Sequence, residues 1–191
     1  MAQDFADKTL LNSDPIIIND FTNWTSVNES IMGGSSYSNC SVKTNGLEFY
    51  GNLVEEGGGF VSCRSPVFSP SLNLSKYRGL QVEVDGEGRT LKLALYCDVN
   101  FIGLNEVFFA GLHWVAELQT ITSGTTVIEI PFDKFEPTIR AKRIPIPLKL
   151  NLNAITQLQL LHSKFGQPGE LNPGFRPGKI KILLHSISGL F

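Results

Sequence analysis

Apolar and polar residues alternate with a period of two along most of this chain, and that pattern limits the folds open to it. Residues 80–84, 91–95 and 180–184 each carry leucine, isoleucine or valine at every second position. Successive side chains of a β-strand point to opposite faces of a sheet, so each run predicts a strand with one face on a core. The sequence contains no long stretch with apolar residues at the i, i+3, i+4 spacing of an amphipathic helix, which argues against a long helix.

Further alternating runs and the turns between them complete this prediction. They place additional strands at 47–53, 60–64, 112–119, 125–130 and 155–161. The tetrapeptide Asp85-Gly86-Glu87-Gly88 predicts a β-hairpin turn, and Ser123-Gly124 separates two more strands. Single helical turns are expected near 75–77 and 133–135. Eight or nine short strands with so little helix indicate an all-β fold, a β-sandwich or jelly roll.

Length and composition are those of one globular domain. The chain has 191 residues, of which 42% are apolar and 18% are charged, which excludes a disordered chain or a coiled coil. We expect residues 1–14 to form a tail and residues 15–191 to form a single domain. The first residues resemble neither a secretory signal nor a mitochondrial presequence, and no apolar run approaches the ~20 residues that span a bilayer. We therefore expect a soluble cytoplasmic or stromal protein, with at most peripheral contact with a membrane.

The three cysteines form a poor disulfide framework because their number is odd and the chain is long. Cys97 continues the alternating row of 91–95, and Cys63 follows Val61 at the same period. Free cysteine is among the most buried residue types. We expect both to be reduced thiols in the core.

The net charge of -2 conceals an uneven distribution of charge along the chain. Residues 134–191 contain only two of the 18 acidic residues but nine of the 16 basic ones. Five of these bases lie in the proline-rich segment 131–154: Lys134, Arg140, Lys142, Arg143 and Lys149. The segment is either a solvated loop or a basic docking edge for an acidic protein or lipid surface. Few aromatic residues accompany the bases, so we expect no nucleic acid partner.

No constellation typical of catalysis is present in the sequence. His113, His162 and His185 lack metal-ligand spacing, and no nucleophile motif occurs. The glycine-rich segments 32–36 and 57–60 favour simple turns over anion-binding nests. An enzyme that binds a phosphate or nucleotide through these segments and Arg64 is the least favoured hypothesis, because no base, nucleophile or metal set accompanies them. We expect no cofactor, no bound metal and no enzymatic activity.

Trp24 is the most conspicuous residue of the polar segment 19–46. An exposed tryptophan on a loop would indicate a sugar platform or a protein-binding residue. A tryptophan that plugs the end of the sandwich is the alternative, and it is slightly favoured.

The order of several motifs resembles a known family. Trp24 leads to Val27-Asn28-Glu29-Ser30-Ile31-Met32-Gly33-Gly34-Ser35-Ser36, and Gly57-Gly58-Gly59-Phe60-Val61-Ser62 follows with Arg64. Segments 72–80, 85–88 and 130–140 continue the pattern. In this order, they resemble the complex I intermediate-associated protein family over about residues 15–190. The resemblance implies a galactose-binding-like β-sandwich and a non-enzymatic assembly or scaffold role.

The resemblance also implies a partner: a subunit or an intermediate of a membrane redox or photosynthetic complex. Glu29 and Ala141 stand where the family often has Asp and Gly, and a free-standing prokaryotic or plastid-type member fits best. We expect the partner to bind across the segment 24–36 and the basic segment. The candidate binding residues are Trp24, Asn28, Met32, Gly33, Gly34, Ser35, Arg64, Arg140, Lys142 and Arg143.

A carbohydrate or small-ligand binding module is the alternative function. It rests on the fold type alone. Its candidate platforms are Trp24, Trp114 and Tyr96, and the sequence leaves open which sheet face Tyr96 and Trp114 occupy.

Overall fold

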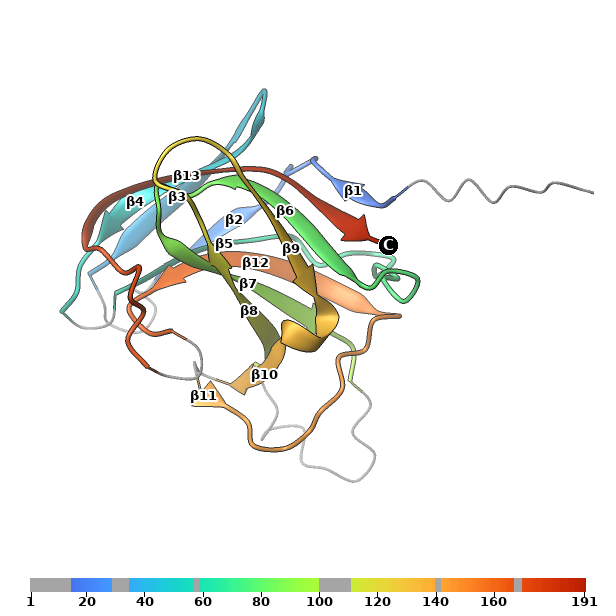
Figure 1. The fold of residues 1–191 in the computed structure, drawn as a ribbon. Helices are drawn as coiled ribbons and strands as arrows, with labels where there is room; N and C mark the ends of the chain where they lie inside the picture. Colours follow the sequence, from blue (N-terminus) through green and yellow to red (C-terminus); the bar gives the residue numbers. More distant parts are fainter. Residues whose placement is uncertain (1–14, 29–34, 57–58, 100–110, 140–141, 167–169) are drawn as a thin grey trace, which may run out of the picture.

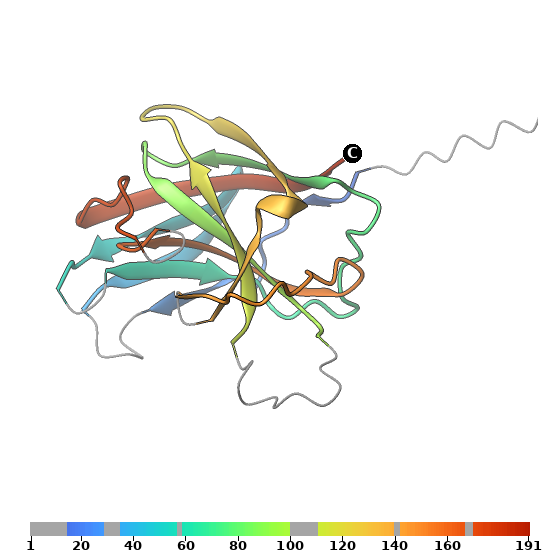
Figure 2. The ribbon, with the colours of Figure 1, turned by 60° about the horizontal axis from the view of Figure 1, so that its bottom comes forward.

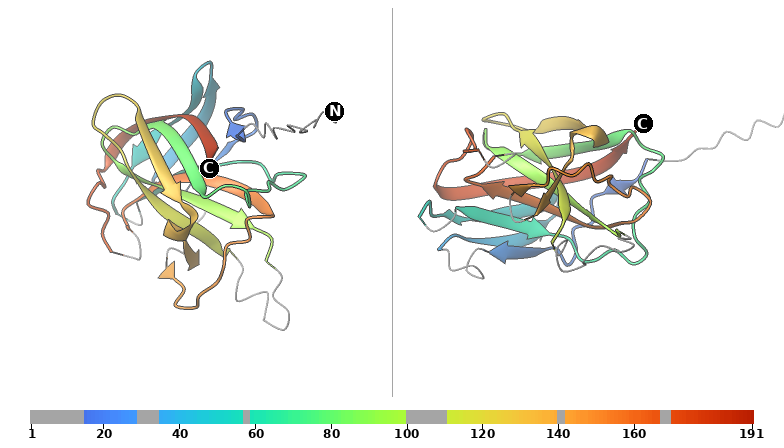
Figure 3. Two further views of the ribbon diagram at one scale, coloured as in Figure 1. Left: turned by 45° about the vertical axis from the view of Figure 1, so that its right-hand side comes forward. Right: turned by 90° about the horizontal axis from the view of Figure 1, so that it is seen from below.

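The computed structural model describes residues 15–28, 35–56, 59–99, 111–139, 142–166 and 170–191, which form two antiparallel sheets packed face to face (Figure 1). The six-stranded sheet has the order β3-β4-β13-β6-β9, with β1 also paired to β13. Its strands are β1 (Ile17–Ile18), β3 (Tyr37–Lys43), β4 (Gly46–Leu53), β6 (Gly79–Asp85), β9 (Thr126–Pro131) and β13 (Gly178–Leu190). This sheet is the upper layer of Figure 1, and β13 runs along its length in the turned views of Figure 3.

The seven-stranded sheet has the order β11-β10-β8-β7-β12-β5-β2. Its strands are β2 (Thr25–Asn28), β5 (Phe60–Arg64), β7 (Thr90–Cys97), β8 (His113–Gln119), β10 (Glu136–Ile139), β11 (Lys142–Arg143) and β12 (Ile155–Ser163). One 3-10 turn, η2 (Phe132–Lys134), lies where a helical turn was predicted. The predicted all-β sandwich is confirmed.

The core lies between the sheets and is built from the alternating positions that the sequence indicated. Leu91, Leu93 and Leu95 of β7 are fully buried, as are Val82 and Val84 of β6. Each such side chain contributes roughly 1.5–3 kcal/mol when it leaves water. No helix among the described residues is long and apolar enough to cross a membrane. Residues 1–14 lie outside those residues, so the predicted tail stays a prediction.

The segment 85–88 is not a hairpin, and that prediction was wrong. It carries the chain from β6 in one sheet to β7 in the other. Both strands bury their apolar faces on the same core, β6 from the six-stranded sheet and β7 from the seven-stranded sheet. The crossing is held by the Gly88 amide, which donates to the carbonyl of Ile121 at 2.7 Å, and Gly88 adopts φ +70°, which glycine allows.

The polar segment 19–46 and the proline-rich segment 131–154, for which the sequence predicted no strand, contain strands. Segment 19–46 includes β2 and β3, and segment 131–154 includes β10 and β11. Their polar and proline-rich sequences lack the alternation that marks buried strands. Strands β2, β3 and β11 lie at sheet edges, and β10 lies next to the edge strand β11. Within the second segment, residues 144–152 place Ile144, Leu148, Leu150 and Leu152 against the core.

Cys40 of β3 and Cys63 of β5 are joined by a disulfide, so the expectation of a reduced thiol at Cys63 was wrong. Their Cα atoms lie 6.2 Å apart, a normal disulfide separation, and the bond links the two sheets. Cys63 is fully buried, as predicted. The sequence gives no hint of the pairing, because the packing of one sheet on the other creates it. Cys97 is free and half-buried, and burial raises the pKa of its thiol.

Candidate functional site

The outer face of the seven-stranded sheet, the side turned away from the six-stranded sheet, gathers polar and aromatic side chains from four adjacent strands. Figure 2 brings the lower side of the molecule forward, where this sheet lies. Side chains alternate along each strand, so Cys63, Leu95 and Leu160 point into the core and the residues next to them in sequence point outward. Four of the outward residues contact one another: Arg64 of β5, Gln159 of β12, Tyr96 of β7 and His113 of β8.

Gln159 is the centre of a hydrogen-bond network on this face. Its Oε1 accepts from Arg64 Nη2 at 2.9 Å and from the Tyr96 hydroxyl at 2.7 Å. Its Nε2 donates to Ser62 Oγ at 2.7 Å, and Ser62 donates to the carbonyl of Val27 at 3.0 Å. Gln159 is 2% exposed, so the network is a packed part of the sheet surface. Such a network holds Arg64 and Tyr96 in fixed positions.

Tyr96 stands between two other side chains. The Arg64 guanidinium lies 5.0 Å from the centre of its ring, and the His113 ring stacks on it with centroids 5.1 Å apart. In the sheet order, β5 and β8 lie on opposite sides of β7, so Arg64 and His113 approach the phenol from opposite sides. Both faces of the Tyr96 ring are therefore occupied.

Burial sets the charge of this cluster. It raises the pKa of the Tyr96 phenol and lowers the pKa of His113, so both groups are neutral near pH 7. His113 Nδ1 donates to the carbonyl of Gly111 at 2.7 Å, which leaves Nε2 as an acceptor. Arg64 is the only charged group of the four. The arrangement is suited to binding a polar or anionic group.

The part of the chain that the structure describes contains no cluster of His, Cys, Asp and Glu that could hold a metal ion. His162 is buried inside the sandwich and belongs to its packing. Its Nδ1 donates to the carbonyl of Thr90 at 2.9 Å, and its ring stacks on Phe175.

The predicted basic residues Lys142 and Arg143 form β11, at the edge of the same sheet. Both are exposed, and Arg143 pairs with Glu136 of β10 at 3.4 Å. Arg143 lies opposite Thr138, which lies opposite His113, so this edge continues the face that carries Tyr96. Five strand spacings separate β11 from β5, or about 24 Å along the sheet. Arg64 and the basic edge thus lie on one surface but are not in contact.

The residues predicted near the start of the chain lie elsewhere. Trp24 is buried and packs edge-on against Phe21, so it offers no exposed ring. Its burial agrees with the favoured interpretation, in which Trp24 plugs the end of the sandwich. Asn28 ends β2, at the sheet edge opposite β11. Ser35 is exposed ahead of β3.

Four of the predicted binding residues lie outside the described residues: Met32, Gly33, Gly34 and Arg140. The described parts of segments 24–36 and 131–154 flank opposite edges of one sheet, so they do not form the continuous surface that we expected.

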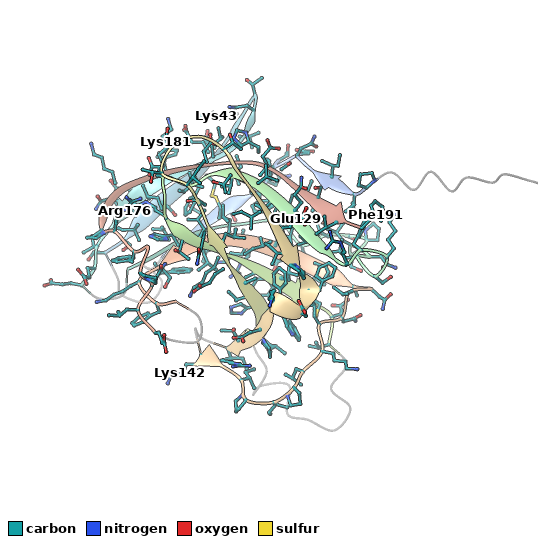
Figure 4. The ribbon with its side chains drawn as sticks, in the orientation of Figure 1. Lys43, Glu129, Lys142, Arg176, Lys181 and Phe191 are labelled. Atoms are coloured by element: carbon teal, nitrogen blue, oxygen red, sulfur yellow. A yellow bond between two sulfur atoms is a disulfide. The ribbon has the colours of Figure 1, made fainter. Side chains whose placement is uncertain are left out.

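The basic residues of segment 134–191 do not lie together on one edge of the fold either. Lys142 lies in the seven-stranded sheet, whereas Lys179 and Lys181 lie on β13 of the six-stranded sheet. Figure 4 shows Lys142 and Lys181 far apart. The uneven charge of the sequence therefore becomes two separate basic regions.

Sequence reasoning missed the roles of Gln159 and His113. Side chains alternate along β12, so Gln159 points away from the core that Leu158 and Leu160 enter. This alternation could have marked Gln159 as an outward-facing residue. Which outward residues touch one another depends on strand order, and order is set by long-range pairing. Tyr96 was considered a platform, and the structure turns it outward and Trp114 inward.

Comparisons with solved structures support the fold. The family 11 carbohydrate-binding module of the cellulosomal cellulase Lic26A-Cel5E of Clostridium thermocellum matches 93% of this chain and 95% of its own, with a TM-score of 0.58 and 16% identity. A family 11 module from Clostridium thermocellum in complex with a β-1,3-1,4-mixed-linked tetrasaccharide matches 92% and 95%, with a TM-score of 0.56 and 18% identity. At these identities, the likeness is one of fold.

Comparisons of sequence identify the family. No curated protein matches the sequence. The family model for complex I intermediate-associated protein 30 matches residues 7–183, which is nearly the whole chain. The motifs described above fall within this range, and the fold is the β-sandwich that the resemblance implied. The chain belongs to the complex I intermediate-associated protein 30 family.

Proposed function

We propose that this chain is a non-enzymatic assembly or accessory protein that binds a subunit or an intermediate of a membrane redox or photosynthetic complex. Family membership over residues 7–183 is the observation that carries the proposal, since the family is named for its association with complex I intermediates. The cluster on the outer face agrees with a binding role, because it offers hydrogen-bond donors, acceptors and one positive charge.

The proposed docking surface is the outer face of the seven-stranded sheet together with its β10–β11 edge. Arg64 provides a positioned guanidinium in the middle, and Lys142 and Arg143 provide exposed charges at the rim. Charges at the rim of an interface mainly change the association rate and its salt dependence, whereas buried anchors control dissociation. The rim and the centre therefore have separable effects on binding.

The experiment is capture of partners by the tagged protein from detergent-solubilised membranes of its native host. The double variant K142E/R143E is expected to recover at least about tenfold less partner at low salt. The matched control is K179E/K181E, which changes the charge equally on the other sheet and should recover partner like the wild type. Equal recovery by all three proteins overturns the docking surface, and failure of the wild type to capture any subunit of a redox or photosynthetic complex overturns the function.

A carbohydrate-binding module is the second candidate, and one observation favours it. Tyr96, His113 and Arg64 place aromatic and polar groups together on an exposed sheet face. Against it, Arg64 and His113 occupy both faces of the Tyr96 ring, which leaves no flat surface on which a sugar ring could stack. Calorimetric titration with mixed-linked β-glucan oligosaccharides is expected to show no heat of binding. Binding that disappears in Tyr96→Ala would establish this second function instead.

A further inference from the structure

The outer face of the six-stranded sheet carries two exposed tyrosines among lysines. Tyr37 of β3 is 56% exposed and Tyr50 of β4 is 41% exposed. The register sets out two adjacent rows across β3, β4 and β13: Tyr37, Asn52 and Lys179 form one, and Asn39, Tyr50 and Lys181 form the other. We call the four residues Tyr37, Tyr50, Lys179 and Lys181, together with Lys43, the tyrosine–lysine patch.

The pairing of the strands sets the spacing of the residues in the patch. Tyr37 and Tyr50 are diagonal neighbours on paired strands, which places them roughly 7–8 Å apart. Both rings stand on an open sheet face with polar Asn39 and Asn52 beside them. The patch therefore presents amphipathic rings within a plane of polar groups.

The charge of the patch is positive. Glu48 lies in the next row, opposite Ser41 and Leu183, and it bridges Lys43 at 3.5 Å and Lys181 at 3.1 Å. Three lysines against one glutamate leave a surplus of positive charge. Arg176 and Glu87 lie beside Lys181, since the Arg176 guanidinium donates to the carbonyl of Glu87 and the Glu87 carboxylate accepts from the amide of Lys181. These two opposite charges cancel and leave the surplus unchanged. Figure 4 shows Lys43, Lys181 and Arg176 toward one end of the molecule, away from Lys142.

The other half of the same sheet has a surplus of negative charge. Glu83 and Asp85 of β6 and Glu129 of β9 face outward there, and Arg78 pairs with Glu129 at 3.5 Å. A negatively charged surface would therefore attract the β3–β4–β13 end and repel the β6–β9 end. The charge pattern favours one orientation of the protein on such a surface.

We propose that the tyrosine–lysine patch rests on a membrane surface that contains anionic lipids. Tyrosine is enriched where membranes meet water because its ring is apolar and its hydroxyl is polar, and lysine is attracted to anionic headgroups. Protein interfaces are also rich in tyrosine but poor in lysine, so tyrosines set among several lysines favour an anionic lipid surface over a protein. This contact goes beyond binding of a protein partner and does not depend on it.

The test is co-sedimentation of the purified protein with vesicles of equal parts phosphatidylglycerol and phosphatidylcholine. The wild type is expected to sediment at low salt, and K179E/K181E should partition at least about thirtyfold less, since each lysine near an anionic surface contributes separately. K142E/R143E is the matched control and should sediment like the wild type. The neutral variant K179Q/K181Q, with thermal melts of every variant, separates loss of binding from loss of folding.

The double variant Tyr37→Ala/Tyr50→Ala tests the rings separately. It should reduce the fraction of protein that still sediments with the vesicles at high salt. Equal sedimentation with vesicles of phosphatidylcholine alone, or equal sedimentation of wild type and K179E/K181E, overturns the proposal. Retention on an acidic polysaccharide without sedimentation on the vesicles also overturns it, in favour of a glycan ligand. Partner capture in detergent contains no bilayer, so the proposed function and this contact fail independently.

Discussion

Gln159 and Glu48 occupy comparable outward positions on the two sheets, but their surroundings differ. Gln159 is 2% exposed and hydrogen-bonds to Arg64, Tyr96 and Ser62. Glu48 bridges Lys43 and Lys181, whose side chains are 45% and 68% exposed. The first is a packed network in which each partner depends on the next. The second is a pair of ion bridges from a half-buried glutamate to two lysines that reach into water. One outer face is therefore rigid, and the other is adaptable.

This difference separates stability from binding on the two sheets. Removing one member of a buried polar network leaves the others without partners, which costs more than the lost bond. Removing one exposed charge costs little, because water replaces the partner. The seven-stranded sheet should thus lose stability on substitution, whereas the six-stranded sheet should lose contacts with other molecules and keep its stability.

The substitution Gln159→Leu should have the largest effect. It retains the size of the side chain but leaves Arg64, Tyr96 and Ser62 without their common partner, and the free energy of unfolding should fall by about 3 kcal/mol. Urea denaturation measures it. The matched control is Gln81→Leu on β6, outward on the other sheet, which should change stability by less than about 0.5 kcal/mol. Equal losses at both positions would remove the distinction between the sheets.

The pH dependence of His162 sharpens the same contrast. Burial in the sandwich is the main cause that lowers the pKa of this histidine from 6.5 to about 4, with nearby positive charges adding to it. The unfolded chain binds the proton more readily than the folded one, so this stability is present above about pH 6.5 and falls as the pH decreases toward about 4.

Between about pH 7.5 and about pH 5, the free energy of unfolding should fall by about 2 kcal/mol on account of His162. Urea denaturation at a series of pH values measures the slope. Arg89 Nη1 lies 3.4 Å from His162 Nε2. His162→Gln retains a donor for the Thr90 carbonyl and an acceptor for Arg89, and it should flatten the slope. An unchanged slope in this variant would assign the acid sensitivity to other groups.

The sequence predicted those parts of the molecule that depend on local pattern. Alternation located β6, β7, β12 and the buried leucines, and each lies where expected. It could not locate the Cys40–Cys63 bond or the crossing at 85–88, because both depend on which sheet a strand joins. The same limit applies to the site: Arg64 was selected, but its contacts with Tyr96 and Gln159 come from the order β7-β12-β5.

The substitution Glu48→Gln should have the smallest effect on stability. The hydrogen bond from Lys181 is the main cause that lowers the pKa of Glu48, yet both lysines reach into water, so the free energy of unfolding should fall by about 0.5 kcal/mol or less. Thermal denaturation at low and high salt measures it. The same substitution should strengthen vesicle binding, because it removes a negative charge beside the tyrosine–lysine patch. More of the variant protein than of the wild type should therefore sediment. A large loss of stability here would mean that the six-stranded face is as tightly coupled as the network around Gln159.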